Sequence, residues 1–238
     1  MVNLGGLSYQ PFEKIKIKKP VNRIEYLKEK VRGKVVLDIG AYDETAIFKK
    51  GTKYWLHEEL SKEALIVIGI DNSNNIPDLG IITSKNSHIL KGDINELDYN
   101  SLNCDIDIII AGEFIEHLPN CLDFCITLKS NPNISNKLLI FTTPNSTSFH
   151  NIILGVICRE STHQDHLQTY SYKTLNTICY RAGFKSWTIM PYHVSFSETI
   201  LNSNGPKKTV FFIFEKIVNL IEKLFPLFSG GYIVEIVV

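Results

Sequence analysis

Short apolar segments that end in an acidic residue or a glycine recur along the first two thirds of this chain. They lie at 34–40, 65–71, 88–93, 105–112 and 137–144, and KVVLDIG and LIVIGID show the pattern most clearly. Short runs of continuous apolar character are typical of strands that are buried on both faces of a parallel sheet. This recurring feature therefore predicts an α/β fold.

Segments with apolar residues at helical spacing alternate with these strands, and we expect helices at 21–32, 54–64, 114–129 and 172–182. Strands that alternate with helices imply right-handed crossovers and an open, mostly parallel sheet. The last segment, YIVEIVV, is short and β-branched, so it is predicted to be a final strand, antiparallel to a neighbour at 185–190.

The segment 209–228 is apolar but carries Glu215, Lys216, Glu222 and Lys223 at helical spacing. This pattern predicts an amphipathic helix and argues against a membrane span. We expect the helix to pack on the core. Covering the active site and making peripheral contact with a membrane surface are the alternatives.

The formal net charge is zero, with 25 Lys and Arg against 25 Asp and Glu. Bulk electrostatic binding of nucleic acid needs a basic excess, so nucleic acid is not the expected partner. The N-terminal residues lack the pattern of a secretory signal, and the cysteines are odd in number and lie mostly in apolar stretches. We therefore expect a cytoplasmic protein with reduced thiols.

Acidic residues at the strand ends point to a ligand. In an open α/β sheet, ligands bind beyond the carboxyl ends of the strands, near the point where the strand order reverses. Asp71 ends the second strand, where a carboxylate can accept hydrogen bonds from both ribose hydroxyls, and Asp93 follows the third strand, where it can accept from an adenine amino group. Acidic residues at the ends of successive strands therefore predict a ligand that contains a nucleoside.

Several motifs between about residues 35 and 184 resemble those of the class I S-adenosylmethionine-dependent methyltransferases. They are VVLDIGAYDETA, IGIDNS, KGDINEL, IIIAGEFIEHLPN, LLIFTTPN and HLQTYSYKTLNTICYRAGF. The match is nearest to the branch that contains ubiquinone-pathway O-methyltransferases and glycan-associated methyltransferases. The resemblance implies a Rossmann-like, seven-stranded, mostly parallel sheet with helices on both faces and an antiparallel C-terminal strand.

On this resemblance, residues 1–238 form a single methyltransferase domain. It comprises an N-terminal helical segment (1–33), a cofactor-binding core (34–194), an amphipathic helical insertion or cover (195–230) and the last strand (231–238). The resemblance implies S-adenosylmethionine as cofactor, bound by Asp38, Gly40, Ala41, Tyr42, Asp71, Asn72, Asp93, Ile94 and Ala111.

Other nucleotide-binding folds fit less well. The spacing from Asp38 to Asp71 exceeds the roughly 20 residues of the dinucleotide fingerprint, and neither G-x-G-x-x-G nor a P-loop motif is present. One departure from the methyltransferase pattern stands out, because Tyr42 and Glu44 occupy positions where that family usually has further glycines. Glycine there lets the backbone approach the ligand closely. A methyltransferase-like binding module without turnover is therefore an alternative.

The motif E-x-x-E-H places Glu113, Glu116 and His117 on one face of a helix, if that helix begins at Glu113. Two carboxylates and an imidazole could bind Mg²⁺ or Mn²⁺. Similar motifs occur in metal-assisted O-methyltransferases of this fold, including the branch that methylates small RNAs, where a further histidine completes the site. His166 or His163 could supply that ligand here.

Alternatives remain open for each member of this motif. Glu113 could contact the cofactor, Glu116 and His117 could form first-turn hydrogen bonds, and His117 or His166 could act as a general base without metal. The predicted catalytic and metal-binding set is Glu113, Glu116, His117 and His166. The predicted reaction is O-methylation of a small-molecule, lipid or glycan acceptor, with metal-assisted RNA 2′-O-methylation as a further alternative.

Overall fold

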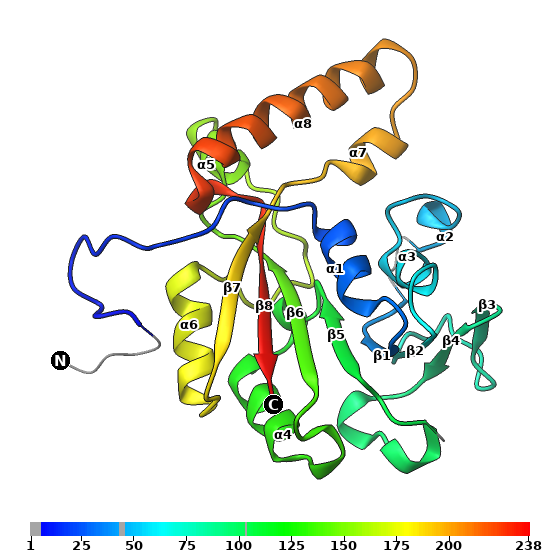
Figure 1. Cartoon of the computed structure of the whole chain (residues 1–238). Helices are drawn as coiled ribbons and strands as arrows, with labels where there is room; N and C mark the ends of the chain where they lie inside the picture. Colours follow the sequence, from blue (N-terminus) through cyan, green and yellow to red (C-terminus); the bar gives the residue numbers. More distant parts are fainter. Residues whose placement is uncertain (1–5, 43–45, 103) are drawn as a thin grey trace.

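The computed structural model describes residues 6–42, 46–102 and 104–238, which form one mixed sheet with helices around it (Figure 1). The eight strands follow the order β3-β4-β2-β1-β5-β6-β8-β7. Their bounds are β1 (Val35–Ile39), β2 (Ile66–Asp71), β3 (Ile81–Ser84), β4 (Ser87–Lys91), β5 (Ile108–Gly112), β6 (Leu138–Pro144), β7 (Trp187–Tyr192) and β8 (Gly231–Val237). β1, β2, β4, β5 and β6 are mutually parallel where they pair.

The structure confirms the predicted Rossmann-like class and the antiparallel C-terminal strand. β8 lies between β6 and β7 and is antiparallel to both, with Pro144 opposite Gly231 on one side. The predicted number of strands was wrong, since the sheet has eight and not seven. The additional strand is β3, a half-exposed edge strand that forms a short antiparallel hairpin with β4.

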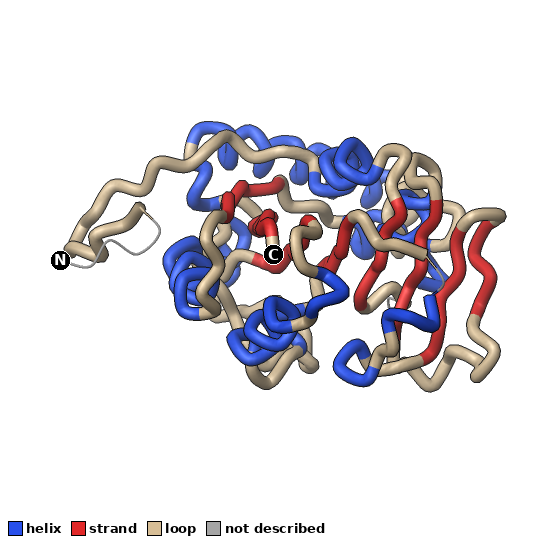
Figure 2. Tube along the Cα trace, turned by 60° about the horizontal axis from the view of Figure 1, so that its bottom comes forward, coloured by secondary structure: helices blue, strands red, loops and turns tan. Residues whose placement is uncertain are grey.

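Helices cover both faces of the sheet (Figure 2). Alternate residues of the buried strands point to opposite faces. Val36 and Ile110 pack with Leu27 of one helical layer. Leu37 and Ile109 belong to the larger core on the other face. The first layer contains α1 (Arg23–Val31) and α3 (Leu56–Ser61), and the second contains α4 (Cys121–Ser130) and α6 (Tyr172–Arg181).

The predicted helix at 114–129 is wrong, because the chain breaks between two helical segments. A 3-10 turn, η3 (Ile115–His117), is followed by extended Leu118, with φ −79° and ψ 137°, and only then by α4. Pro119 disfavours a helical conformation at the residue before it. Asn120 then caps α4 by accepting hydrogen bonds from the amides of Leu122 and Asp123.

The predicted N-terminal helical segment is helical only over α1, within the described residues. Residues 13–20 carry no helix or strand, and Val21 forms a bridge to Tyr192. Farther along the arm, the Tyr9 hydroxyl donates to the carbonyl of Lys173 at 3.0 Å. The basic N-terminal residues therefore run along the β7 edge and onto α6.

The remaining helical segments connect these elements. α5, α7 and α8 lie together at the end of the molecule where the parallel strands terminate (Figure 1). In the described part of the chain, no helix combines the length and apolar character needed to cross a bilayer. The bounds are α2 (Ala46–Lys49), α5 (Phe149–Val156), α7 (Ser197–Leu201), α8 (Pro206–Leu224), η1 (Ile94–Glu96), η2 (Tyr99–Leu102), η4 (Pro132–Ile134) and η5 (Pro226–Phe228).

Candidate functional site

The site lies beyond the carboxyl ends of β1 and β5, the adjacent strands from which the sheet continues in opposite directions. Gly40 follows β1 with φ 72°, in the left-handed region that glycine adopts without strain. A Cβ at Gly40 would lie 2.8 Å from Phe114 Cδ2, so a larger residue would displace that ring. Glycine is therefore required at this predicted cofactor position.

The carboxylate of Asp71 joins the end of β2 to the loop after β1. The Tyr42 amide donates to Asp71 Oδ2 at 3.0 Å, and the Ser73 amide donates to Oδ1 at 2.8 Å. Both carboxylate oxygens of Asp71 therefore hold backbone amides of the loops that follow β1 and β2. Glu44 lies outside the described residues.

The other predicted cofactor residues differ in what they expose. Asp38 is buried, with its Oδ2 2.9 Å from His57 Nδ1, and Ala111 is fully buried. Ala41 is also buried, and its carbonyl accepts from the Trp55 indole. Neither Ala41 nor Ala111 therefore presents appreciable surface, and their contact with a cofactor stays a prediction.

The carboxyl ends of β2 and β4 offer side chains at the surface. Asn72 and Asp93 are exposed, whereas Ile94 is buried. Asp93 caps η1, since its Oδ1 accepts from the Asn95 amide at 2.8 Å. The assignment of these residues to the adenosine side stays a prediction.

Glu113 does not share a helical face with Glu116 and His117, which corrects the expected arrangement. It precedes η3 with φ 53°, a left-handed conformation, so its side chain takes a separate direction. Glu113 Oε1 accepts from the Tyr192 hydroxyl at 2.8 Å and from Thr142 Oγ1 at 2.9 Å, and it lies 3.3 Å from Arg23 Nη1. Glu113 therefore belongs to a hydrogen-bonded network between β5, β6, β7 and α1.

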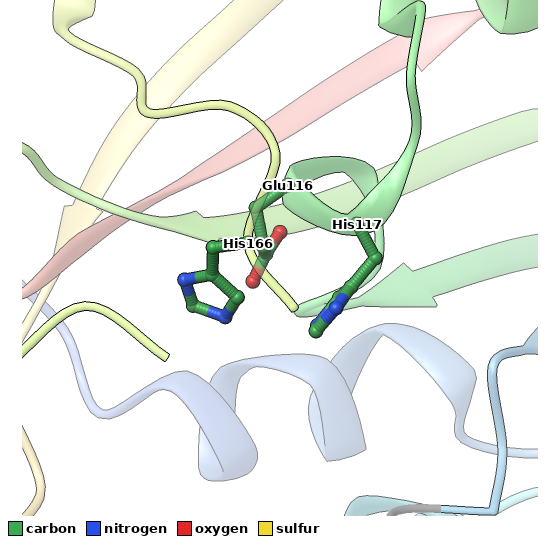
Figure 3. A group of neighbouring side chains, drawn as sticks. All are labelled: Glu116, His117 and His166. Atoms are coloured by element: carbon green, nitrogen blue, oxygen red, sulfur yellow. The ribbon is translucent and has the colours of Figure 1, made fainter. Parts of the chain in front are cut away.

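Glu116, His117 and His166 come together instead, with the Glu116 carboxylate between the two imidazole rings (Figure 3). One potential ligand atom from each lies within 4.8 Å of the others. The two rings stand nearly perpendicular, with centroids 4.8 Å apart. Glu116 is buried, His166 is half-buried and His117 is exposed, so the cluster opens toward solvent on the His117 side.

Backbone hydrogen bonds hold His166 beside η3 even though the two lie far apart in the sequence. The Glu116 carbonyl accepts from the amides of Leu167 at 2.8 Å and Gln168 at 3.1 Å. The Gln168 side chain donates to the Pro119 carbonyl at 2.7 Å, and the Tyr170 hydroxyl donates to the Ile115 carbonyl at 3.1 Å. The loop that carries His166 is therefore fixed at both sides of η3.

Burial dominates the electrostatics of this cluster. It raises the pKa of Glu116 well above its usual range, and the nearby Glu113 carboxylate raises it further. Burial also lowers the pKa of His166, with additional contributions from His117 and His163. At neutral pH, His166 is therefore an uncharged imidazole that can accept a proton or coordinate a metal.

One buried atom of the cluster lacks a hydrogen-bond partner among the described residues. Glu116 Oε2 accepts from Thr143 Oγ1 at 3.0 Å, but Glu116 Oε1 accepts from no described group. A buried unsatisfied oxygen is costly, and such atoms in folded proteins call for a specific explanation. Glu116 also contributes a carboxylate oxygen to the group with His117 and His166, and one carboxylate with two imidazoles fits a divalent cation.

Sequence reasoning missed four residues of this region: Arg23, Thr142, Thr143 and Tyr192. Arg23 and Tyr192 orient Glu113, and Thr143 orients Glu116. Strand β7 and helix α1 carry no motif that marks Tyr192 or Arg23, because both act through contacts distant in sequence. His163, the alternative fourth ligand, is outside the cluster, with its ring 5.7 Å from that of His166.

Structural comparison with known proteins identifies the fold of the chain, whereas sequence comparison finds no match. No family model matches the chain, and no curated protein matches it. A methyltransferase of Thermotoga maritima, described as S-adenosylmethionine-dependent and as a possible histamine N-methyltransferase, has a TM-score of 0.55 and 13% identity, covering 90% of this chain and 86% of that one.

Two further structures show the same likeness. An S-adenosylmethionine-dependent methyltransferase of Archaeoglobus fulgidus gives a TM-score of 0.51 and 17% identity, covering 90% of this chain and 93% of its own. The methyltransferase domain of bacterial CtHen1-C gives 0.53 and 17%, covering 91% and 97%. At these identities the likeness establishes the Rossmann-like methyltransferase fold.

Proposed function

We propose that the protein transfers the methyl group of S-adenosylmethionine to an oxygen atom of a small-molecule, lipid or glycan acceptor. The observation that carries this proposal is the cluster of Glu116, His117 and His166 at the carboxyl edge of a methyltransferase fold. Fold alone does not determine activity, and it is the chemistry of these three side chains that supports methyl transfer.

The cofactor would lie over the ends of β1 and β2. Asp71 would accept from the ribose hydroxyls, the backbone at Gly40 would approach the methionine portion, and Asp93 would lie on the adenine side. When bound, S-adenosylmethionine supplies a methyl group that its sulfonium already activates. The protein therefore has to align the acceptor and remove one proton.

Without a metal ion, His166 is the proposed proton acceptor. Its lowered pKa keeps it neutral at physiological pH, and its half-buried ring remains accessible to an acceptor hydroxyl. His117, which is exposed on the open side of the cluster, would contact the acceptor.

A divalent cation is the alternative occupant of the same three residues, and His166 would then be its ligand and not the proton acceptor. With Glu113 committed to Arg23, Thr142 and Tyr192, the donor set is one carboxylate and two imidazoles. Mg²⁺ prefers oxygen ligands, so this set favours Mn²⁺ over Mg²⁺. When bound, the cation would lower the pKa of an acceptor hydroxyl.

Manganese binding can be measured apart from catalysis. Titration of the protein with Mn²⁺, followed by electron paramagnetic resonance, should show one site that the His166→Ala variant loses. His163→Ala is the matched control, because His163 lies outside the cluster and should leave Mn²⁺ affinity unchanged. Equal Mn²⁺ binding by wild type and His166→Ala would remove the metal from the proposal.

The activity itself can be tested with methyl-labelled S-adenosylmethionine and a cell extract, separated afterwards into lipids, glycans, small metabolites and RNA. The label should enter one of the first three fractions, and His166→Ala should reduce its incorporation about a hundredfold. Label in RNA alone would favour the RNA-methylating alternative. Cofactor binding without label in any fraction would identify a module without turnover.

A further inference from the structure

Helix α8 exposes a continuous apolar stripe, which is unusual for a helix that also packs against its own domain. Its members recur at intervals of three and four residues, so they lie on one face. Their exposed fractions range from 51% to 67%. The stripe consists of Val210, Ile213, Ile217, Leu220 and Leu224.

The acidic side chains of α8 point the other way, into the protein. Glu222 is fully buried, with its Oε2 2.7 Å from His193 Nδ1 and its Oε1 accepting from the Val194 amide at 3.2 Å. Glu215 Oε2 accepts from the Phe196 amide at 2.7 Å. Both carboxylates of the helix are therefore used to attach it to the segment after β7, and the stripe is left outward.

The lysines of α8 remain on the exposed surface. Among the described residues, Lys207, Lys208, Lys216 and Lys223 form no ion pair, and all four are exposed. Lys207 and Lys208 lie in the first turn, where the helix dipole disfavours positive charge, so they do not serve helix stability. Lys207, Lys216 and Lys223 flank the outer face of α8, which carries no acidic side chain, whereas Lys208 lies in the first turn near the opposite face.

Helix α5 extends this surface. α5 packs against α8, and the two lie side by side at the carboxyl edge of the sheet (Figure 1). Ile152, Val156 and Ile157 are exposed at and just beyond α5, and the helix contains no acidic residue. Single exposed apolar residues are normal, but several exposed apolar side chains on two helices that pack together are typical of an interaction site.

We propose that the outer face of α5 and α8 binds the surface of an anionic lipid bilayer. Apolar side chains of an amphipathic helix enter the boundary between headgroups and acyl chains, while lysines beside them contact lipid phosphates. An anionic bilayer is therefore complementary both to the apolar stripe and to the lysines. Binding removes the apolar stripe from water. It also brings the lysines close to the negative phosphates of the lipids.

A second copy of the chain satisfies only the apolar part. Lys216 and Lys223 each precede a stripe residue, so they flank the stripe on one side, and Phe214 and Ile221 flank it on the other. Antiparallel pairing of two stripes would bring lysine against lysine, and parallel pairing would bring lysine against an apolar residue. The charge pattern therefore favours the membrane over self-association.

Membrane binding would place the candidate site near the lipid surface. Asn145 follows β6, and its side chain donates to the carbonyls of Leu227 and Ser229 just after α8, which fixes the membrane-facing helices to the carboxyl edge. The inference does not require methyl transfer, because lipid binding can be measured without cofactor.

Vesicle sedimentation with the full chain tests the proposal. The protein should pellet with vesicles of mixed phosphatidylcholine and phosphatidylserine, and not with phosphatidylcholine alone, at physiological ionic strength. Replacing the four lysines of α8 by Gln should weaken partitioning about a hundredfold. The matched control replaces four exposed lysines elsewhere by Gln: Lys34, Lys50, Lys85 and Lys185.

A second variant separates the lipid surface from a partner copy. Ile217→Ser combined with Leu220→Ser keeps the charge and should weaken partitioning by about tenfold or more, with an unchanged melting temperature because both side chains are exposed. The proposal is overturned if the wild-type protein does not bind anionic vesicles. It is also overturned if the control with four lysines replaced elsewhere loses as much binding as the variant with the α8 lysines replaced. A dimer by light scattering that this double variant dissociates, without vesicle binding, would assign the surface to self-association instead.

Discussion

Glu116 belongs to the candidate site, and its burial lowers the stability of the fold when its carboxyl group is ionised. The side chain is only 1% exposed, and its raised pKa means that the folded state favours the protonated carboxyl. Because the unfolded chain ionises near the ordinary value of 4.5, the folding contribution of Glu116 is most favourable below that pH. It is lost as the pH rises through the higher pKa of the folded state.

Glu116→Gln should therefore stabilise the metal-free protein at alkaline pH. Urea unfolding in EDTA should show the variant more stable than wild type at pH 8 by about 1 kcal/mol or more, and nearly equal to it at pH 4. The same variant should lose Mn²⁺ binding. A wild type that is at least as stable as the variant at pH 8 would contradict the assigned burial of this carboxylate.

His57 plays a structural part in the cofactor half. Its ring is fully buried between Asp38 Oδ2 at 2.9 Å and Thr83 Oγ1 at 3.0 Å. His57→Ala should lower the free energy of unfolding by about 2–4 kcal/mol, because it leaves a cavity and a buried carboxylate without its partner. His163→Ala is the exposed control and should stay within about 0.5 kcal/mol of wild type. Equal effects of the two substitutions would show that the Asp38–His57 contact contributes little.

At the scale of elements, the break between η3 and α4 creates the cluster. A helix that began at Glu113 and continued to residue 129 would have placed Glu113 on the face of Glu116. The left-handed Glu113 separates the two carboxylates, the segment before Pro119 ends η3, and the Glu116 carbonyl then accepts from the loop that carries His166. Pro119 is visible in the sequence, but the loop contact is not, because it joins residues about 50 positions apart.

Asn120 should contribute measurably to this arrangement. Its side-chain oxygen accepts from the amides of Leu122 at 3.1 Å and Asp123 at 3.2 Å, which would otherwise lack partners at the start of α4. Asn120→Ala should cost about 1 kcal/mol in urea unfolding. Asn133→Ala offers a comparison at an exposed position, and an effect as large as that of Asn120→Ala would argue against the cap.

Across the whole molecule, the sheet was predictable where its strands are buried on both faces. Apolar runs within 34–40 and 105–112 mark β1 and β5, because a strand that is covered on both faces of a parallel sheet buries nearly all of its residues. β3 escaped prediction because it is a four-residue edge strand with half-exposed side chains. The residues of the site likewise divide into those that the sequence marks and those that it does not. Gly40 and Asp71 end strands that the sequence marks, whereas Tyr192 and Arg23 reach Glu113 only through the tertiary fold.

The central claim is that S-adenosylmethionine binds at the carboxyl edge, over Gly40 and Asp71. Isothermal titration calorimetry of the full chain with S-adenosylmethionine tests it directly, with Asp71→Ala as the site variant. Saturable binding by wild type is predicted, and Asp71→Ala should weaken it about tenfold or more, because it removes charge-assisted hydrogen bonds to the ribose. Absence of heat at millimolar cofactor, or equal affinity of the two proteins, would contradict the account.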